Sequence, residues 1–162
     1  MQKTIQRKDA VLGKTMKILI DADGCPVVDI TVRAAKEHKL ECLILCDTSH
    51  IFNNSYAKTV MVSKGADSVD FKIVNLLSPN DIVVTQDYGL AAMCLARNAQ
   101  VIRQDGLVYT QFNIDALLAS RYECKKIRNA GGRIKGNSKR RPEEDERFKI
   151  ELNKLIEKSQ NI

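Results

Sequence analysis

Six aspartates of this 162-residue chain stand close to the expected ends or beginnings of strands and helices. Carboxylates that gather in one place repel each other and raise each other's pKa unless a cation offsets their charge. Mg²⁺ and Mn²⁺ suit such a set, because they are hard ions that take oxygen ligands and keep several waters. The residue types therefore predict a site for Mg²⁺ or Mn²⁺, provided that the fold brings the acids together. The six are Asp21, Asp23, Asp67, Asp70, Asp87 and Asp105.

Each acid also has an ordinary structural interpretation. Asp87 and Asp67 can N-cap the helices expected after them, and Asp23 can form a turn with the glycine that follows it. Asp105, also followed by glycine, is typical of a turn. Asp21 has the weakest structural alternative, since it interrupts a buried strand. Only convergence of the acids at one edge of a sheet favours the metal site over caps and turns.

Short apolar segments that are typical of strands alternate along the chain with segments of helical periodicity. This alternation predicts a Rossmann-like α/β domain, in which helices cover both faces of a parallel sheet. The carboxyl ends of the strands then meet at one edge, where ligands bind in such folds. Asp21 and Asp87 should end neighbouring strands there. We expect strands at residues 17–20, 41–46, 58–62, 81–85 and 100–103, and helices at residues 27–39, 67–77, 88–97, 113–130 and 142–158.

Composition divides the chain into three segments. Residues 1–15 precede the first strand and show no apolar periodicity, so we expect an N-terminal arm that is dispensable for folding. Residues 16–130 carry all the expected strands and form the α/β domain. Residues 131–162 begin as a basic, glycine-rich linker and end in a helix with one apolar face.

The net charge of +6 lies in the C-terminal part of the chain. Residues 1–120 contain 13 basic and 13 acidic side chains, whereas residues 121–162 contain 13 basic and 7 acidic ones. A basic excess in one segment is typical of a protein that binds a polyanion, although a solvated tail is the structural alternative. We expect RNA phosphates to be held there by charge, without sequence readout. The predicted contacts are Lys125, Lys126, Arg128, Arg133, Lys135, Lys139, Arg140 and Arg141.

Cysteines and apolar runs exclude several classes of protein. The five cysteines are odd in number and form no CxxC pair, so neither a disulfide framework nor a zinc site is expected. No apolar run approaches the roughly 20 residues of a membrane helix, and the N-terminus lacks the apolar region of a secretory signal. We therefore expect a cytoplasmic protein with no membrane partner. Cys25 stands before an expected helix and could be a nucleophile, but no histidine is near it in sequence. His50 follows the second strand and could reach the acidic edge.

Several motifs of the chain resemble the YaiI/YqxD family of bacterial proteins. The motifs are DADGCPV at residues 21–27, GADSVD at 65–70 and DIVVTQDYGLA at 81–91, with smaller matches near residues 109–114 and 131–136. The resemblance covers roughly residues 17–156. It implies a PIN-like or NYN-type version of the Rossmann-like fold, an acidic metal site and an RNase-type activity. Carried over position by position, it implies five of these acids, Asp21, Asp23, Asp67, Asp70 and Asp87, whereas Asp105 matches no fixed acid of the pattern. Gly24 and Asn137 depart from it, where alanine and proline are more usual.

The residues and the resemblance together predict a divalent-metal-dependent phosphodiesterase, a nuclease that acts on RNA. Asp21 and Asp87, with Asp67 or Asp70, are expected to hold the ion, and Asp23 to complete the catalytic set as a further ligand or by orienting water. One alternative is a non-catalytic RNA-binding or ribosome-associated module with a structural metal. Another is a small-molecule phosphohydrolase, against which the lack of a glycine-rich phosphate loop counts.

Overall fold

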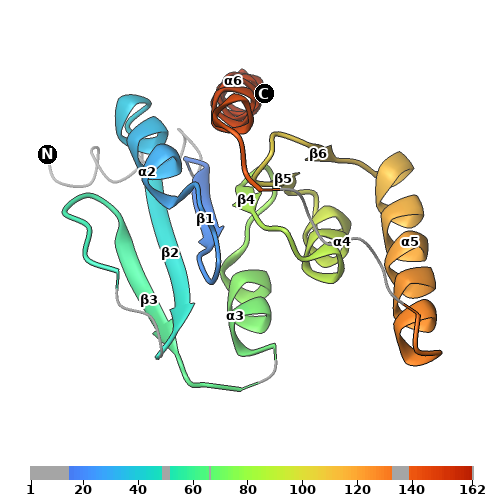
Figure 1. The fold of residues 1–162 in the computed structure, drawn as a ribbon. Coiled ribbons are helices and arrows are strands. Elements are labelled where there is room, and N and C mark those ends of the chain that lie inside the picture. Colours follow the sequence, from blue (N-terminus) through green and yellow to red (C-terminus); the bar gives the residue numbers. More distant parts are fainter. Residues whose placement is uncertain (1–14, 49–51, 66, 133–138, 162) are drawn as a thin grey trace, which may run out of the picture.

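A computed structural model describes residues 15–48, 52–65, 67–132 and 139–161. Within these ranges the chain forms one six-stranded sheet and five helices (Figure 1). The strands are β1 (Lys17–Asp21), β2 (Glu41–Asp47), β3 (Lys58–Val62), β4 (Ile82–Val84), β5 (Gln100–Ile102) and β6 (Val108–Tyr109). The helices are α2 (Val28–Glu37), α3 (Ser68–Leu76), α4 (Tyr88–Ala96), α5 (Gln111–Asn129) and α6 (Pro142–Gln160).

The strand order of the sheet is β3-β2-β1-β4-β5-β6. All neighbouring strands are parallel except β5 and β6, which are antiparallel. This is the order of the Rossmann fold, in which the direction of the crossovers reverses between the first and fourth strands. The predicted Rossmann-like fold is therefore confirmed. The prediction that the strands leading to Asp21 and Asp87 are neighbours is also confirmed, because β1 pairs with β4.

Successive side chains of each strand point to opposite faces, and the sheet therefore has two cores. Ile18 and Ile20 of β1 belong to the core under α2 and α6. Leu19, between them, belongs to the core under α3, α4 and α5. Asp21 continues the alternation of Leu19, so its side chain lies on the face covered by α3 and α4 (Figure 1).

The C-terminal helix predicted at residues 142–158 is present as α6 and packs beside α2. Its apolar face is buried in the same core as β1, with Phe148, Leu152 and Ile156 fully inaccessible. Arg140 also fastens the start of this helix, because its Nη2 donates to the carbonyl oxygen of Gln104, at 2.9 Å. The helix is thus part of the body of the α/β fold.

The bounds of the expected elements agree with the observed ones to within two residues, and two differences have a physical reason. Helix α5 begins at Gln111 instead of 113, because Thr110 and Asn113 cap it reciprocally, with Thr110 Oγ1 accepting from the backbone N of Asn113 at 3.2 Å. Strand β6 was not expected, because a two-residue strand carries no periodicity that a sequence pattern could show.

The turn between β5 and β6 brings Gly106 against the first turns of α6. Gly106 has φ +91°, and a Cβ atom there would lie 3.0 Å from the carbonyl carbon of Arg147. Gly106→Ala should therefore lower the free energy of unfolding by roughly 2–3 kcal/mol, the sum of backbone strain and overpacking. Gly131→Ala is the matched control, since Gly131 has φ +83° but open space around it. We expect it to cost only about 1 kcal/mol for the backbone. Urea unfolding of both variants measures the difference. Equal losses of unfolding free energy would show that α6 moves away from the added methyl group without cost.

Candidate active site

Asp21 and Asp87 follow neighbouring strands and are joined by one buried hydroxyl. Thr85, 2% exposed, stands directly after β4. Its Oγ1 donates to Asp21 Oδ2 at 2.8 Å and accepts from the backbone N of Asp87 at 3.0 Å. Thr85 therefore holds the two acids in a fixed relation at the point where the strand order reverses.

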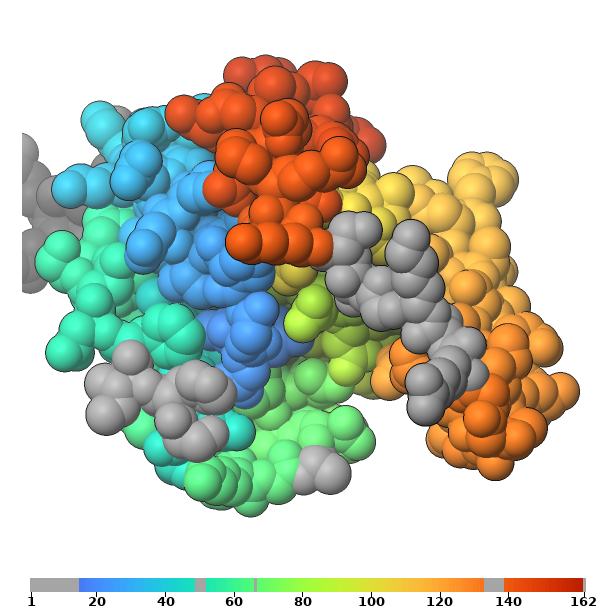
Figure 2. Space-filling view, viewed as in Figure 1, coloured from blue at the N-terminus to red at the C-terminus, as the bar shows by residue number. Residues whose placement is uncertain are grey.

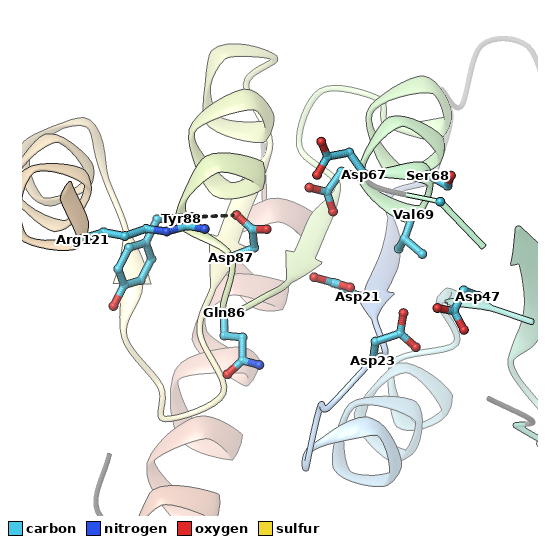
Figure 3. A pocket seen from close by; sticks show the side chains of 12 residues that line it. Asp21, Asp23, Asp47, Asp67, Ser68, Val69, Gln86, Asp87, Tyr88 and Arg121 are labelled. Atoms are coloured by element: carbon cyan, nitrogen blue, oxygen red, sulfur yellow. Dashed lines mark ion pairs between the residues drawn. The ribbon is translucent and has the colours of Figure 1, made fainter. Parts of the chain in front are cut away.

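Five of the six predicted aspartates line one open pocket of about 450 Å³ beyond the carboxyl ends of the strands, and Asp105 does not. We call it the acidic pocket; its acids come from β1 and the turn after it, from the end of β2, and from the starts of α3 and α4 (Figure 3). Asp21 lies in its centre, with Asp87 on one side and Asp67, Asp23 and Asp47 on the other. The sequence-predicted convergence of the acids is thus present, whereas their catalytic and metal-binding roles stay predictions.

The acidic pocket raises the pKa of two of its carboxyl groups. Burial, together with the nearby charges of Asp87 and Asp23, raises the pKa of Asp21 to about 6, although the hydrogen bond from Thr85 opposes the shift. Burial, followed by the charges of Asp87, Asp21 and Asp67, raises the pKa of Asp70 to about 6. A cation in the pocket would remove this repulsion, and carboxyl groups perturbed in this way are concentrated at functional sites.

The donor set suits a hydrated hard cation. Within the described ranges, no three carboxylate, imidazole or thiol groups are arranged to hold one ion. A closed four-ligand centre of the zinc type therefore does not fit these residues. Mg²⁺ keeps several of its waters and commonly takes only one or two protein carboxylates, which the cluster around Asp21 can supply.

Two of the acids test the helix-cap interpretation directly. Asp87 is a true N-cap of α4, since its Oδ1 accepts from the backbone N of Gly89 at 2.9 Å and of Leu90 at 3.2 Å. Asp67 stands at the corresponding position of α3 but makes no side-chain cap bond, and its φ of +63° places it in the left-handed region. The cap interpretation is correct for Asp87 and wrong for Asp67.

Among the side chains that were not predicted for the site, Arg121 and Asp47 line the acidic pocket and Thr85 binds Asp21 beside it. Arg121 comes from α5, and its Nη1 lies 3.6 Å from Asp87 Oδ1 (Figure 3). Its place depends on how α5 packs, which no local pattern shows. Thr85 is a buried hydroxyl in an apolar strand segment and likewise gives no signal. Asp47 ends β2 and lines the pocket. The rule that located Asp21, an acid at the carboxyl end of a strand, would also have found Asp47.

The predicted RNA contacts fall into three groups. Lys125, Lys126 and Arg128 are exposed on α5, and Lys139 and Arg141 are exposed before α6. Arg140 is instead engaged within the protein: besides Gln104, its Nη2 binds Asp145 Oδ1 at 2.6 Å. An RNA contact by Arg140 would cost these bonds, so its role stays a prediction with a competing structural role. Arg133 and Lys135 lie outside the described residues.

Asp105 is the predicted acid that does not line the acidic pocket. Asp105 pairs with Arg103, Nη2 to Oδ2 at 2.7 Å, and this bond lowers the pKa of Asp105 in the turn before β6. Burial raises the pKa of Cys25 to about 11, which disfavours the thiolate that a nucleophile needs. His50 lies outside the described residues.

None of the described helices has the length and apolar character needed to cross a membrane.

The fold and the site define a Rossmann-like α/β protein with an acidic pocket at the switch point of its sheet. The chain belongs to the Uncharacterized BCR, YaiI/YqxD family, whose model matches residues 19–158. The family membership predicted from the motifs is confirmed. A UPF0178 protein of Exiguobacterium sibiricum is 52% identical over 141 residues, which cover 87% of this chain and 96% of the relative. A UPF0178 protein of Clostridium acetobutylicum is 48% identical over 143 residues, covering 87% of this chain and 97% of the relative.

One solved structure is similar over most of the chain. It is the crystal structure of a mutant of Rae1 (YacP) from Bacillus subtilis, which covers 90% of this chain and 99% of its own length. The sequence identity is 11% and the TM-score is 0.42. A similarity of this size carries no argument about the function of the chain.

Proposed function

We propose that this protein is a cytoplasmic, divalent-metal-dependent phosphodiesterase that cleaves RNA. The observation that carries the proposal is the acidic pocket: five aspartates from separate segments meet at the switch point of a parallel sheet, and two of them have a pKa of about 6. Among Asp21, Asp87 and one of Asp67 or Asp70, one or two carboxylates would bind Mg²⁺ or Mn²⁺ directly, and the others would bind its waters. When bound, the ion would lower the pKa of a water molecule and offset the charge of the phosphate.

The chain's own residues have distinct parts in this proposal. Thr85 fixes the carboxylate of Asp21, because its hydroxyl donates to Oδ2. The backbone amides at the start of α4 fix Asp87 in the same way. Asp23, at the rim of the pocket beside Asp21, would orient the attacking water and accept its proton. The exposed lysines and arginine of α5 would hold the RNA backbone by charge.

Cleavage of a labelled RNA strand by the purified protein tests the proposal. We expect turnover with Mg²⁺ or Mn²⁺, none with EDTA, and recovery when the ion is restored. RNA binding without turnover under all these conditions would contradict the phosphodiesterase and favour the second candidate, a non-catalytic RNA-binding module. The observation that favours this second candidate is the Arg121–Asp87 ion pair, which already offsets one acid of the pocket from within the protein.

The contribution of α5 to RNA binding can be measured separately. Replacing Lys125, Lys126 and Arg128 together by Gln should lower the slope of log affinity against log salt by about 2, the loss of three contacts to single-stranded RNA. The matched control replaces Lys149, Lys154 and Lys158 of α6, which lie on the opposite face of the sheet. Fluorescence anisotropy at several salt concentrations gives the slopes. An equal change in both variants would mean that only net charge matters.

A further inference from the structure

A second cleft adjoins the acidic pocket between α3, α4 and α5. It has a volume of about 410 Å³ and shares four lining residues with the acidic pocket, among them Asp87 and Arg121. We call it the α3–α5 cleft. Figure 2 shows the surface hollowed between α3 (green) and the C-terminal half of α5 (orange). Its outer walls are apolar: Phe71 of α3 is 60% exposed and Met93 of α4 is 38% exposed. A cavity that passes from charged to apolar walls suits a molecule that has both a charged and a flat apolar part.

The side of α5 that faces this cleft changes character along the helix. Ile114 is buried and Leu118 is partly buried in the core under α4. Arg121 follows Ile114 by seven residues and Leu118 by three, so it lies on the same face of the helix. Lys125 and Arg128 continue that face four and seven residues further on. The apolar inner face of α5 is thus replaced by a basic one where the helix passes the acidic pocket.

Arg121 stands where the two cavities join, and its present ion pair is weak. The guanidinium and the Asp87 carboxylate are 3.6 Å apart, and their side chains are 62% and 36% exposed. Exposed pairs of this kind contribute little to stability. A guanidinium binds phosphate through two parallel hydrogen bonds, which makes a phosphate a better partner than this single long contact.

We propose that the α3–α5 cleft is a nucleotide subsite, in which Arg121 binds a phosphate entering the acidic pocket and Phe71 with Met93 contacts the base of the adjoining nucleotide. The proposal rests on the proposed function of the acidic pocket and deepens it. Every base has a flat face that stacks on an aromatic ring, and a methionine side chain adapts to such a ring. The subsite therefore requires a base without selecting which one, and it sets the position of the strand.

Binding of two fluorescein-labelled single strands tests the subsite. One is a short oligoribonucleotide and the other is an abasic strand of the same length. Ca²⁺ replaces Mg²⁺, and gel electrophoresis checks that the strands stay intact. Phe71→Ala should weaken binding of the base-containing strand about tenfold and leave the abasic strand unchanged. Arg121→Gln should weaken both strands and lower the salt slope by about 0.7.

The chain offers matched controls for both substitutions. Phe112 is 95% exposed on α5 outside the cleft, and Arg97 is exposed at the end of α4. Phe112→Ala and Arg97→Gln should bind both strands as the wild type does. Phe71→Trp should restore the preference for the base-containing strand, which a merely structural role of Phe71 would not require.

The outcomes separate this proposal from that of the acidic pocket. Base-dependent binding through Phe71 without any cleavage in Mg²⁺ or Mn²⁺ would support the subsite and contradict the proposed phosphodiesterase activity. Metal-dependent cleavage with the Phe71 and Arg121 variants behaving like their controls would overturn the subsite and leave the phosphodiesterase. Failure of the wild type to bind either strand at micromolar concentrations would also overturn the subsite.

Discussion

Replacing Asp21 by Asn should abolish Mn²⁺ binding and RNA cleavage while making the metal-free protein more stable at neutral pH. Asn has nearly the shape of Asp and can still accept the hydrogen bond from Thr85, but it lacks the charge that a divalent ion requires. The buried negative charge beside Asp87 and Asp23 is also removed. Calorimetric titration with Mn²⁺, a cleavage assay and urea unfolding in EDTA measure the three effects.

The stability gain should depend on pH in a defined direction. The pKa of Asp21 is about 6 in the folded protein, above its ordinary value of 3.8. The folded state therefore binds this proton more tightly, and the stability that it contributes is lost as the pH rises through 6. We expect the Asn variant to match the wild type near pH 4 and to exceed it by about 1–2 kcal/mol at pH 7.5.

Asp115→Asn is the matched control, since Asp115 is exposed on α5 and lines neither cavity of the site. It should leave Mn²⁺ affinity, cleavage and the pH profile unchanged. An Mn²⁺ affinity of the Asp21 variant equal to that of the wild type would contradict metal binding in the acidic pocket. A loss of stability at every pH would indicate a structural role for the carboxylate.

Phe148→Ala should have the largest effect on stability alone. The ring is fully buried between α6 and the sheet, in the core that also holds β1. Removing it leaves a cavity and should cost about 3–5 kcal/mol, or roughly 10 °C in Tm. Ile150→Ala is the control on the same helix, because Ile150 is 52% exposed, and it should cost less than about 0.5 kcal/mol. Similar melting temperatures for both variants would contradict the burial of α6 in this core.

Local patterns were sufficient to predict the five parallel strands and the edge at which Asp21 and Asp87 meet. The apolar strands and helical periodicities depend on near neighbours in sequence, and the rule for the carboxyl ends of parallel strands then brought Asp21 and Asp87 together. The assignment of Asp105 to a turn was correct for the same reason, since the residue and its partner Arg103 are two positions apart.

Such patterns could not predict the groups that tertiary packing brings to the site. Arg121 reaches Asp87 only because α5 packs against α4. Arg140 looked like part of a basic tail, but it binds the carbonyl of Gln104, 36 residues away. Cys25 looked activated by a helix N-terminus, but its burial has the opposite effect on the thiol. In each case a contact distant in sequence decides the chemistry.

The two cores of the sheet also determine the order in which the chain can become compact during synthesis. The core under α3, α4 and α5 uses residues no later than 118. The core under α2 requires Phe148 to Ile156, close to the end of the chain. Until α6 has been made, this core lacks Phe148, Leu152 and Ile156, and the apolar surface that these side chains cover is open to water and to other nascent chains. Protein released before α6 is complete should therefore be a substrate for chaperones or proteases, even though every strand of the sheet has already been made.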